Sequence, residues 1–238
     1  GLDIGHNTEV YGWIAMSVGT GDKAGVQFEA IKTPDAVTHE PYTVSFATTW
    51  SSPPAIFSAM QTFDGGDPSH MRMTSAATTT EVDLFVEEET CSDEELRHTT
   101  ETVGVVAMKT NWVPPAPPPI VPVSGTYANL LEVGEVTNVA LSNVVITYTG
   151  AFSDPVIIGG TPSHNGDEEV SVRIRGTIDT DAKTFSFYLD IPNHGAGQGA
   201  ICGGNTHVPE QFSWLIMEQG VWDDIEAGKG TYGQCSGG

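Results

Sequence analysis

The segment HTTETVGVVAM, from His98 to Met108, has two relatives in the same chain. HNTEVYGWIAM begins at His6, and HVPEQFSWLIM begins at His207. In each segment Glu follows His by three residues, and a mostly apolar run leads to Met. Successive apolar residues are typical of a strand that is buried on both faces. We therefore interpret the three segments as one structural element, which recurs because the fold itself is repeated.

The His-x-x-Glu spacing raises the alternative that these segments hold a metal ion or an acid–base pair. On a strand, residues three apart point to opposite faces. We therefore expect the side chains of His98 and Glu101 to lie apart, and we interpret the motif as the polar start of a central strand. Trp13 and Trp214 occupy the same position of the pattern, which indicates core packing for both.

A second internal match supports a repeated fold. Residues 53–73 align with residues 154–174, and the alignment places Arg72 on Arg173. Tandem repeats commonly form extended arrays. The repeat predicts five segments: residues 1–20 as the last strand of a preceding repeat or a donated strand, 21–113 as the first unit, 114–123 as a Pro-rich linker, 124–222 as the second unit, and 223–238 as a tail or the start of a next repeat.

Short alternations of apolar and polar residues dominate each unit. Tyr42, Val44 and Phe46 alternate with polar residues, and the stretches 82–86 and 185–189 do the same. This period of two predicts half-buried strands, which turns such as DGGD and NGDE connect. The sequence therefore predicts an all-β protein with two six-stranded antiparallel β-sandwiches. The stretch VPPAPPPIVP predicts a polyproline II linker that spaces them, with a ligand for an SH3-like partner as the alternative.

The charge balance limits the partners of the protein. The 238 residues include 31 Asp and Glu against 9 Lys and Arg, which gives a net charge of −22. Nucleic acid is excluded as a partner because phosphate binding needs a basic surface. No apolar run reaches the roughly 20 residues of a membrane helix, so we expect no membrane insertion. We expect a secreted protein or one on the extracellular surface.

The cysteine count leaves the disulfide pairing open. Three cysteines are an odd number, so at least one is unpaired within this chain. A disulfide between Cys202 and Cys235 and a bond from Cys91 to a neighbouring chain are both consistent with this count. The absence of a Cys-x-x-Cys pair argues against a zinc site.

Several longer segments resemble a known family. The first unit contains VSFATTWSSPPAIFSAMQTFD and HTTETVGVVAM, and the second contains ITYTGAFSDPVII and FSWLIME. Both units resemble the H-type lectin domain of snail agglutinins and discoidin-like proteins. The resemblance implies a six-stranded antiparallel sandwich that is often trimeric and binds N-acetylgalactosamine in clefts between protomers. The aromatic residue that stacks on the sugar in that family, and the family disulfide, have no counterpart here.

The resemblance also indicates candidate glycan-binding residues. Arg72 and Arg173 match an Arg in the fourth strand of the family. Asp190 and His194 lie where the family places a sugar-binding His beside an aromatic residue. As an alternative, each Arg only pairs with a nearby carboxylate, and His194 is a solvated loop residue.

Acidic turns are the candidates for a cofactor site. Asp64, Asp67, Asp167 and Glu168 lie in equivalent turns, and a further acidic loop covers residues 87–95. Ca²⁺ needs several oxygen ligands that converge on one point, and these carboxylates could supply them. No EF-hand spacing is present, so a solvated acidic rim is the alternative. We expect no other cofactor.

Known catalytic motifs are absent from the sequence. It contains no Gly-x-Ser-x-Gly, no Walker loop and no His-Glu-x-x-His, which argues against an enzyme. We expect a non-enzymatic structural or adhesive repeat module that self-associates into a fibre or surface assembly. Strand edges or domain faces would form the contacts. A carbohydrate-binding lectin is the alternative function.

Overall fold

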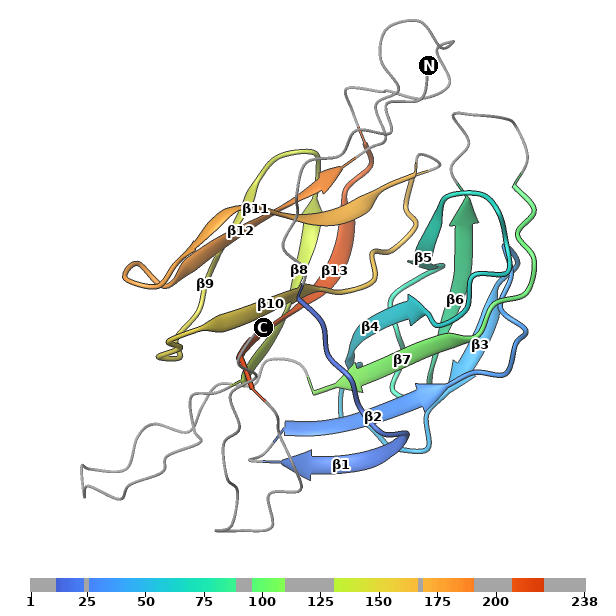
Figure 1. Ribbon diagram of the computed structural model, residues 1–238, viewed down its shortest axis with the longest axis horizontal. Coiled ribbons are helices and arrows are strands. Elements are labelled where there is room, and N and C mark those ends of the chain that lie inside the picture. Colours follow the sequence, from blue (N-terminus) through green and yellow to red (C-terminus); the bar gives the residue numbers. More distant parts are fainter. Residues whose placement is uncertain are drawn as a thin grey trace, which may run out of the picture.

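The protein is all-β (Figure 1). The computed structural model describes residues 12–23, 26–88, 96–109, 131–166, 169–190 and 207–220. Every regular element in these ranges is a strand, β1 to β13, and every ladder between named strands is antiparallel. Within the same ranges no helix long and apolar enough to span a membrane is found. The all-β, antiparallel prediction is confirmed, and the fold is sandwich-like.

The first half of the chain, residues 19–109, contains two sheets. Sheet A has the order β1-β2-β7-β4 and sheet B has the order β3-β6-β5. Their strands are β1 (Gly19–Lys23), β2 (Val26–Lys32), β3 (Tyr42–Ser45), β4 (Ala55–Met60), β5 (Ser69–Met73), β6 (Glu81–Glu88) and β7 (Val103–Met108).

The second half, residues 131–220, also contains two sheets. Sheet A′ has the order β8-β13-β10 and sheet B′ has the order β9-β12-β11. Their strands are β8 (Leu131–Val139), β9 (Val144–Thr147), β10 (Pro155–Gly159), β11 (Ser171–Asp179), β12 (Thr184–Asp190) and β13 (Glu210–Glu218).

The sequence repeat recurs as a repeat of strand order. Apart from β1, sheet A reads β2-β7-β4 and sheet A′ reads β8-β13-β10, so each strand has a counterpart six strands later. Sheets B and B′ correspond in the same way. The apolar runs after His98 and His207 form the central strands β7 and β13, as expected for strands that are buried on both faces.

Each half has its own apolar core. The first core combines side chains from sheets A and B and is mainly aliphatic, with Val82, Leu84 and Val105 fully buried. The second core combines sheets A′ and B′ and is aromatic. Within it, Phe187 contacts the ring of Phe212 edge-on, with 5.2 Å between ring centroids. The same strand topology therefore tolerates two different packings, provided that the alternation of buried positions is kept.

A third apolar cluster, which we call the seam, joins the two halves. It lies between the outer faces of sheets A and A′, at the centre of Figure 1, where β4 contacts β13 and β8. Its principal members from sheet A are Val26, Phe28, Ala55, Phe57, Val106 and Met108, and those from sheet A′ are Leu131, Val133, Ile158, Leu215 and Met217.

The seam pairs equivalent faces of the two halves. In sheet A, Phe57 of β4 lies opposite Val106 of β7. In sheet A′, Ile158 of β10 lies opposite Leu215 of β13. All four side chains belong to the seam. The Pro-rich residues 113–122 lie outside the described residues, so the polyproline II linker stays a prediction. The seam shows that the two halves are in contact.

The N-terminal relative of the His-x-x-Glu segment behaves differently from the other two. Residues 12–17 form no strand, and a Cβ on Gly12 would lie only 2.6 Å from the carbonyl oxygen of Ile157, so this segment follows β10 closely. Ile14 packs against the seam, whereas Trp13 is 75% exposed. The expectation that Trp13 packs in a core is therefore wrong, because its neighbour Ile14 takes the protein-facing position. Trp214, in contrast, packs against the second core.

Candidate functional site

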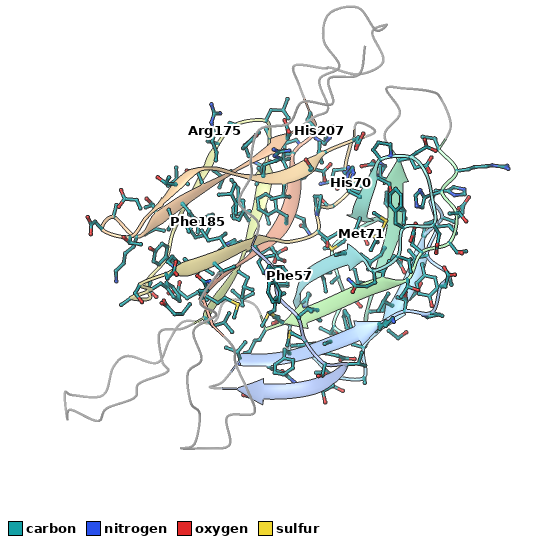
Figure 2. All side chains as sticks on the ribbon, in the orientation of Figure 1. Phe57, His70, Met71, Arg175, Phe185 and His207 are labelled. Atoms are coloured by element: carbon teal, nitrogen blue, oxygen red, sulfur yellow. The ribbon has the colours of Figure 1, made fainter. Side chains whose placement is uncertain are left out.

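A buried charged cluster lies where the two halves meet beside β5. We call it the Arg72 junction. Arg72 is 0% exposed although it carries a full positive charge. Figure 2 shows the neighbouring His70 at the boundary between the halves. The cluster contains His70, Arg72 and Glu87 from the first half and Ser163, His164, Glu169 and Glu210 from the second.

The guanidinium of Arg72 is bonded to both halves. Its Nη1 atom lies 2.5 Å from Oε2 of Glu87, which belongs to the neighbouring strand β6. Its Nε and Nη2 atoms donate to the carbonyl oxygen of Ser163, at 2.9 and 2.6 Å. Nη2 also lies 3.2 Å from Oε1 of Glu210. One half therefore supplies a counter-ion, and the other supplies a counter-ion and a backbone acceptor.

Two histidines extend the junction. Nδ1 of His70 lies 3.1 Å from Oε1 of Glu169, and Nε2 lies 3.0 Å from Oε2 of Glu87. Nε2 of His164 lies 3.3 Å from Oε1 of Glu87, and its ring meets that of Phe85 edge-on at 5.2 Å. Each basic side chain of the junction thus lies beside at least one carboxylate, and most of these pairs cross between the halves.

The junction shifts the pKa values of Glu87 and His70. Burial alone would raise the pKa of Glu87, but His164, His70 and the charge of Arg72 outweigh it and lower the pKa to about 2. Burial alone would lower the pKa of His70, but its contacts with Glu169 and Glu87 outweigh it and raise the pKa. Both shifts favour the charged forms of these two side chains.

Backbone contacts accompany the ionic link. The amide of Met73 donates to the carbonyl of Pro162 at 3.0 Å, and the amide of Thr161 donates to the carbonyl of Ile56 at 3.2 Å. The amide of Ser58 donates to the hydroxyl of Thr161 at 2.9 Å. The segment 161–163 of the second half therefore covers the edges of both β4 and β5. Covered edges cannot pair with other chains.

The His-x-x-Glu motif holds the loops on which the junction depends. Glu101 accepts hydrogen bonds from the amides of Asp64 and Gly65, and from the hydroxyl of Thr62. Glu210 does the same in the second half, where it accepts from the amides of Asn165 and Gly166 and from the hydroxyl of Ser163. The buried carboxylate of each motif thus fixes the loop between two strands, β4–β5 in one half and β10–β11 in the other.

The expectation that His and Glu of the motif lie apart is wrong. Nε2 of His98 lies 3.1 Å from Oε1 of Glu101, and Nδ1 lies 2.7 Å from Oε1 of Glu88. The reason is that residues 98–101 precede β7, which begins at Val103, so the alternation of a strand does not apply to them. His207 and Glu210 are also neighbours, at 3.8 Å. The motif is nevertheless architectural, since its groups are buried and bonded to the fold.

Other buried carboxylates also hold turns. Glu29 accepts hydrogen bonds from two successive amides, at residues 47 and 48, and Glu132 and Glu218 hold residues 149–150 and 153–154 in the same way. The acidic residues at 87 and 88, expected in a loop, instead end strand β6 with buried side chains. Part of the acidic excess is therefore internal architecture.

Burial alone would raise the pKa of Glu101. The hydrogen bonds from Thr62, Asp64 and Gly65, together with that of His98, outweigh it and lower the pKa to about 2. A carboxylate that accepts several backbone amides is stabilised in its charged form. The loop tip is therefore fastened most firmly when Glu101 is ionised.

The two arginines that sequence reasoning selected have different environments. Arg173 of β11 lies 3.6 Å from Asp190, and their side chains are 38% and 42% exposed. Arg72 pairs with Glu87 at the equivalent position, but it is fully buried, so it offers no surface to a glycan. Both arginines therefore pair with a carboxylate, and only Arg173 keeps exposed surface that a ligand could contact.

The surface around Arg173 contains an aromatic residue that sequence reasoning missed. Tyr188 lies opposite Arg173 in the β11–β12 ladder, and the guanidinium carbon of Arg175 lies 5.7 Å from the centre of its ring. Figure 2 shows Arg175 pointing outward from this sheet. The period-two pattern of 185–189 could have revealed Tyr188, because it places this ring on the face opposite the core.

The candidates that lie in the described ranges form no metal site. Asp64 and Asp67 are exposed, and no group of three or more His, Cys, Asp or Glu in the described ranges is arranged to hold a metal ion. Asp167, Glu168 and His194 lie outside the described residues, as do the three cysteines. His70, Ser163 and His164 were not selected from the sequence, and Glu87 and Glu210 were considered only for other roles, because the contacts that join them come from the other half of the chain.

Comparisons with protein families, with curated proteins and with solved structures found no match for this chain. The function has to be inferred from the site itself.

The equivalent arginines give a matched test of the junction. We expect Arg72→Ala to lower the free energy of unfolding by about 3–5 kcal/mol, because it leaves Glu87 and Glu210 buried without compensation. Arg173→Ala removes an exposed pair and should cost about 1 kcal/mol or less. Urea unfolding of both variants at pH 7 measures the difference. An equal decrease in the free energy of unfolding for both variants would show that the halves are not joined through Arg72 in solution.

Glu101 predicts how stability depends on pH. Its pKa in the folded state, about 2, lies below the ordinary 4.5. The contribution of ionised Glu101 to the free energy of unfolding is therefore complete above about pH 4.5, and it is lost as the pH falls toward 2. Gln cannot ionise, so in Glu101→Gln we expect the decrease in the free energy of unfolding on acidification to be smaller by on the order of 2–3 kcal/mol.

Urea unfolding of wild type and Glu101→Gln at several pH values between about 3 and 6 measures this effect. Glu40→Gln removes an exposed carboxylate from the same half and serves as the control for the loss of one negative charge. Parallel stability curves for wild type and Glu101→Gln would contradict the assignment.

Proposed function

We propose that this chain is a non-enzymatic structural or adhesive protein of the cell exterior, built from two H-type-lectin-like sandwich units. In this proposal the two units form one rigid building block that self-associates. The observation that carries the proposal is the double connection between the halves, through the apolar seam and the Arg72 junction. A block with fixed internal geometry can transmit force and orientation, which a pair of modules on a flexible tether cannot.

The hydrogen bonds and ion pairs of the buried carboxylates and histidines support a non-enzymatic role. In the described part of the chain, the buried carboxylates Glu29, Glu101, Glu132, Glu210 and Glu218 each accept hydrogen bonds from turns. His98 and His70 are each held between two carboxylates. These groups are committed to holding the fold, whereas a general acid or base has to reach a substrate.

The surface chemistry supports an extracellular building block. A net charge of −22 keeps the protein well solvated and sets a repulsion between copies that salt reduces. The covered edges of β4 and β5 direct any association to other surfaces, because their backbone groups are already bonded. Self-association would then use specific loops and sheet faces.

Self-association is directly measurable. We expect the purified chain, of 25.2 kDa, to form larger species in sedimentation velocity as its concentration rises, and to show filaments or sheets by negative-stain microscopy. Deletion of residues 1–20 should reduce this assembly if the N-terminal segment is donated between copies. A folded protein that remains monomeric at every concentration would contradict the proposal.

Glycan recognition is the second candidate, and one observation favours it. Arg173, Tyr188 and Asp190 lie together on the outer face of sheet B′, and both charged side chains are partly exposed. An aromatic ring beside charged hydrogen-bonding groups is suited to a sugar. We expect a glycan array to give signals that Arg173→Ala and Tyr188→Ala both reduce. Silence of the folded wild type across the array would remove this candidate.

A further inference from the structure

We propose that a second copy of this chain docks its β4–β5 loop, residues 61–68, on the outer face of sheet B′ around Arg173, Tyr188 and Asp190. Inside each molecule Ser163 and His164 of the β10–β11 loop dock on sheet B in the corresponding way. This inference rests on the proposed function, because it names the two surfaces through which copies associate.

The two loops are equivalent by their anchoring. The carboxylate of Glu101 accepts hydrogen bonds from the hydroxyl of Thr62 and from the backbone amide of Asp64. In the other half Glu210 holds Ser163 by its hydroxyl and residue 165 by its amide. The residue between the two anchored positions is Phe63 in the β4–β5 loop and His164 in the β10–β11 loop. Phe63 therefore takes the place of His164.

The two docking surfaces are equivalent by their register. On sheet B, Arg72 lies opposite Phe85, and Glu87 pairs with Arg72. On sheet B′, Arg173 lies opposite Tyr188, and Asp190 pairs with Arg173. Each surface thus combines one arginine, one aromatic ring and one carboxylate in the same arrangement. We call them the first seat and the second seat.

The occupied first seat shows which contacts matter. The ring of His164 meets Phe85 edge-on at 5.2 Å. The guanidinium of Arg72 donates hydrogen bonds to the carbonyl oxygen of Ser163 and to the carboxylate of Glu210. The interaction therefore consists mainly of three contacts: an aromatic contact, a backbone acceptor and a carboxylate that anchors the loop.

All three contacts can be made again between two copies. Phe63 would meet Tyr188 edge-on, and the carbonyl of Thr62 and the carboxylate of Glu101 would face Arg173. The contact between His70 and Glu169 has no counterpart, because the equivalent positions are Ser171 and Pro68. The copy–copy contact should therefore be weaker and less dependent on pH than the internal one.

Exposure shows that both partners are accessible. Phe63 is 79% exposed, and the side chains of Arg173 and Asp190 are 38% and 42% exposed. The chain's own second half already occupies the first seat, so the β4–β5 loop of another copy would bind to the second seat, on sheet B′. Loop and seat lie on different halves, so each copy can use both at once. Such a heterologous contact joins copies head to tail, into an open filament or a closed ring.

Sedimentation velocity at about 150 mM salt, where repulsion between acidic copies is screened, tests this contact. We expect Phe63→Asp and Arg173→Glu each to weaken self-association by about tenfold or more, since an aromatic or arginine anchor commonly dominates an interface. Leu96→Asp replaces another exposed apolar residue, which belongs neither to the β4–β5 loop nor to the second seat, and should leave association unchanged.

A mixture of the two variants gives the decisive result. Phe63→Asp keeps an intact second seat, and Arg173→Glu keeps an intact loop, so equal amounts of the two should form a dimer and nothing longer. Because the substituted side chains are exposed, circular dichroism should match the wild type. Phe63→Ser and Tyr188→Ala provide a second pair if either of the first variants unfolds.

The outcomes separate this inference from the proposed function. If the wild type assembles but both variants assemble equally well, self-association stands and this contact is overturned. If the mixed variants remain monomeric while the wild type assembles, the loop and the seat are not partners. If the wild type itself stays monomeric at every concentration, the proposed function fails together with the inference.

Discussion

Arg72 is a fully charged side chain with no exposed surface, and the arrangement of the two halves depends on how that charge is compensated. A buried charge is tolerated only when counter-ions and hydrogen-bond acceptors surround it. The first half supplies Glu87, but the second half supplies Glu210 and the carbonyl of Ser163. Arg173, at the equivalent position of the other half, keeps its counter-ion and remains partly exposed. Contact between the halves is thus what turns an ordinary surface pair into a buried junction.

The carboxylate of the His-x-x-Glu motif links the repeated fold to that junction. Glu210 fixes the β10–β11 loop through backbone amides, and the same carboxylate faces Arg72. Glu101 fixes the β4–β5 loop in the same manner, which leaves Phe63 at an exposed tip. One motif therefore produces one loop that closes the molecule upon itself and one loop that faces outward. This asymmetry is the physical basis for the proposed assembly.

The seam and the junction have complementary roles. The seam buries apolar side chains from equivalent sheet faces and supplies a non-directional attraction between the halves. The junction and the backbone bonds at Ser58 and Met73 are directional, so they select one register for that contact. A rigid block with an acidic surface is suited to a structural or adhesive role, which is the function we propose.

The sequence by itself determined the all-β, antiparallel class, several of the strands and the repeat, because period-two alternation and turn residues act locally. It also selected Arg72 and Arg173 as equivalent residues. Only the tertiary structure decided that Arg72 is buried, that His98 contacts Glu101, and that Ile14 rather than Trp13 faces the protein. Each of these outcomes depends on a surface contributed by a distant part of the chain, or on where a strand begins, and no local pattern encodes either.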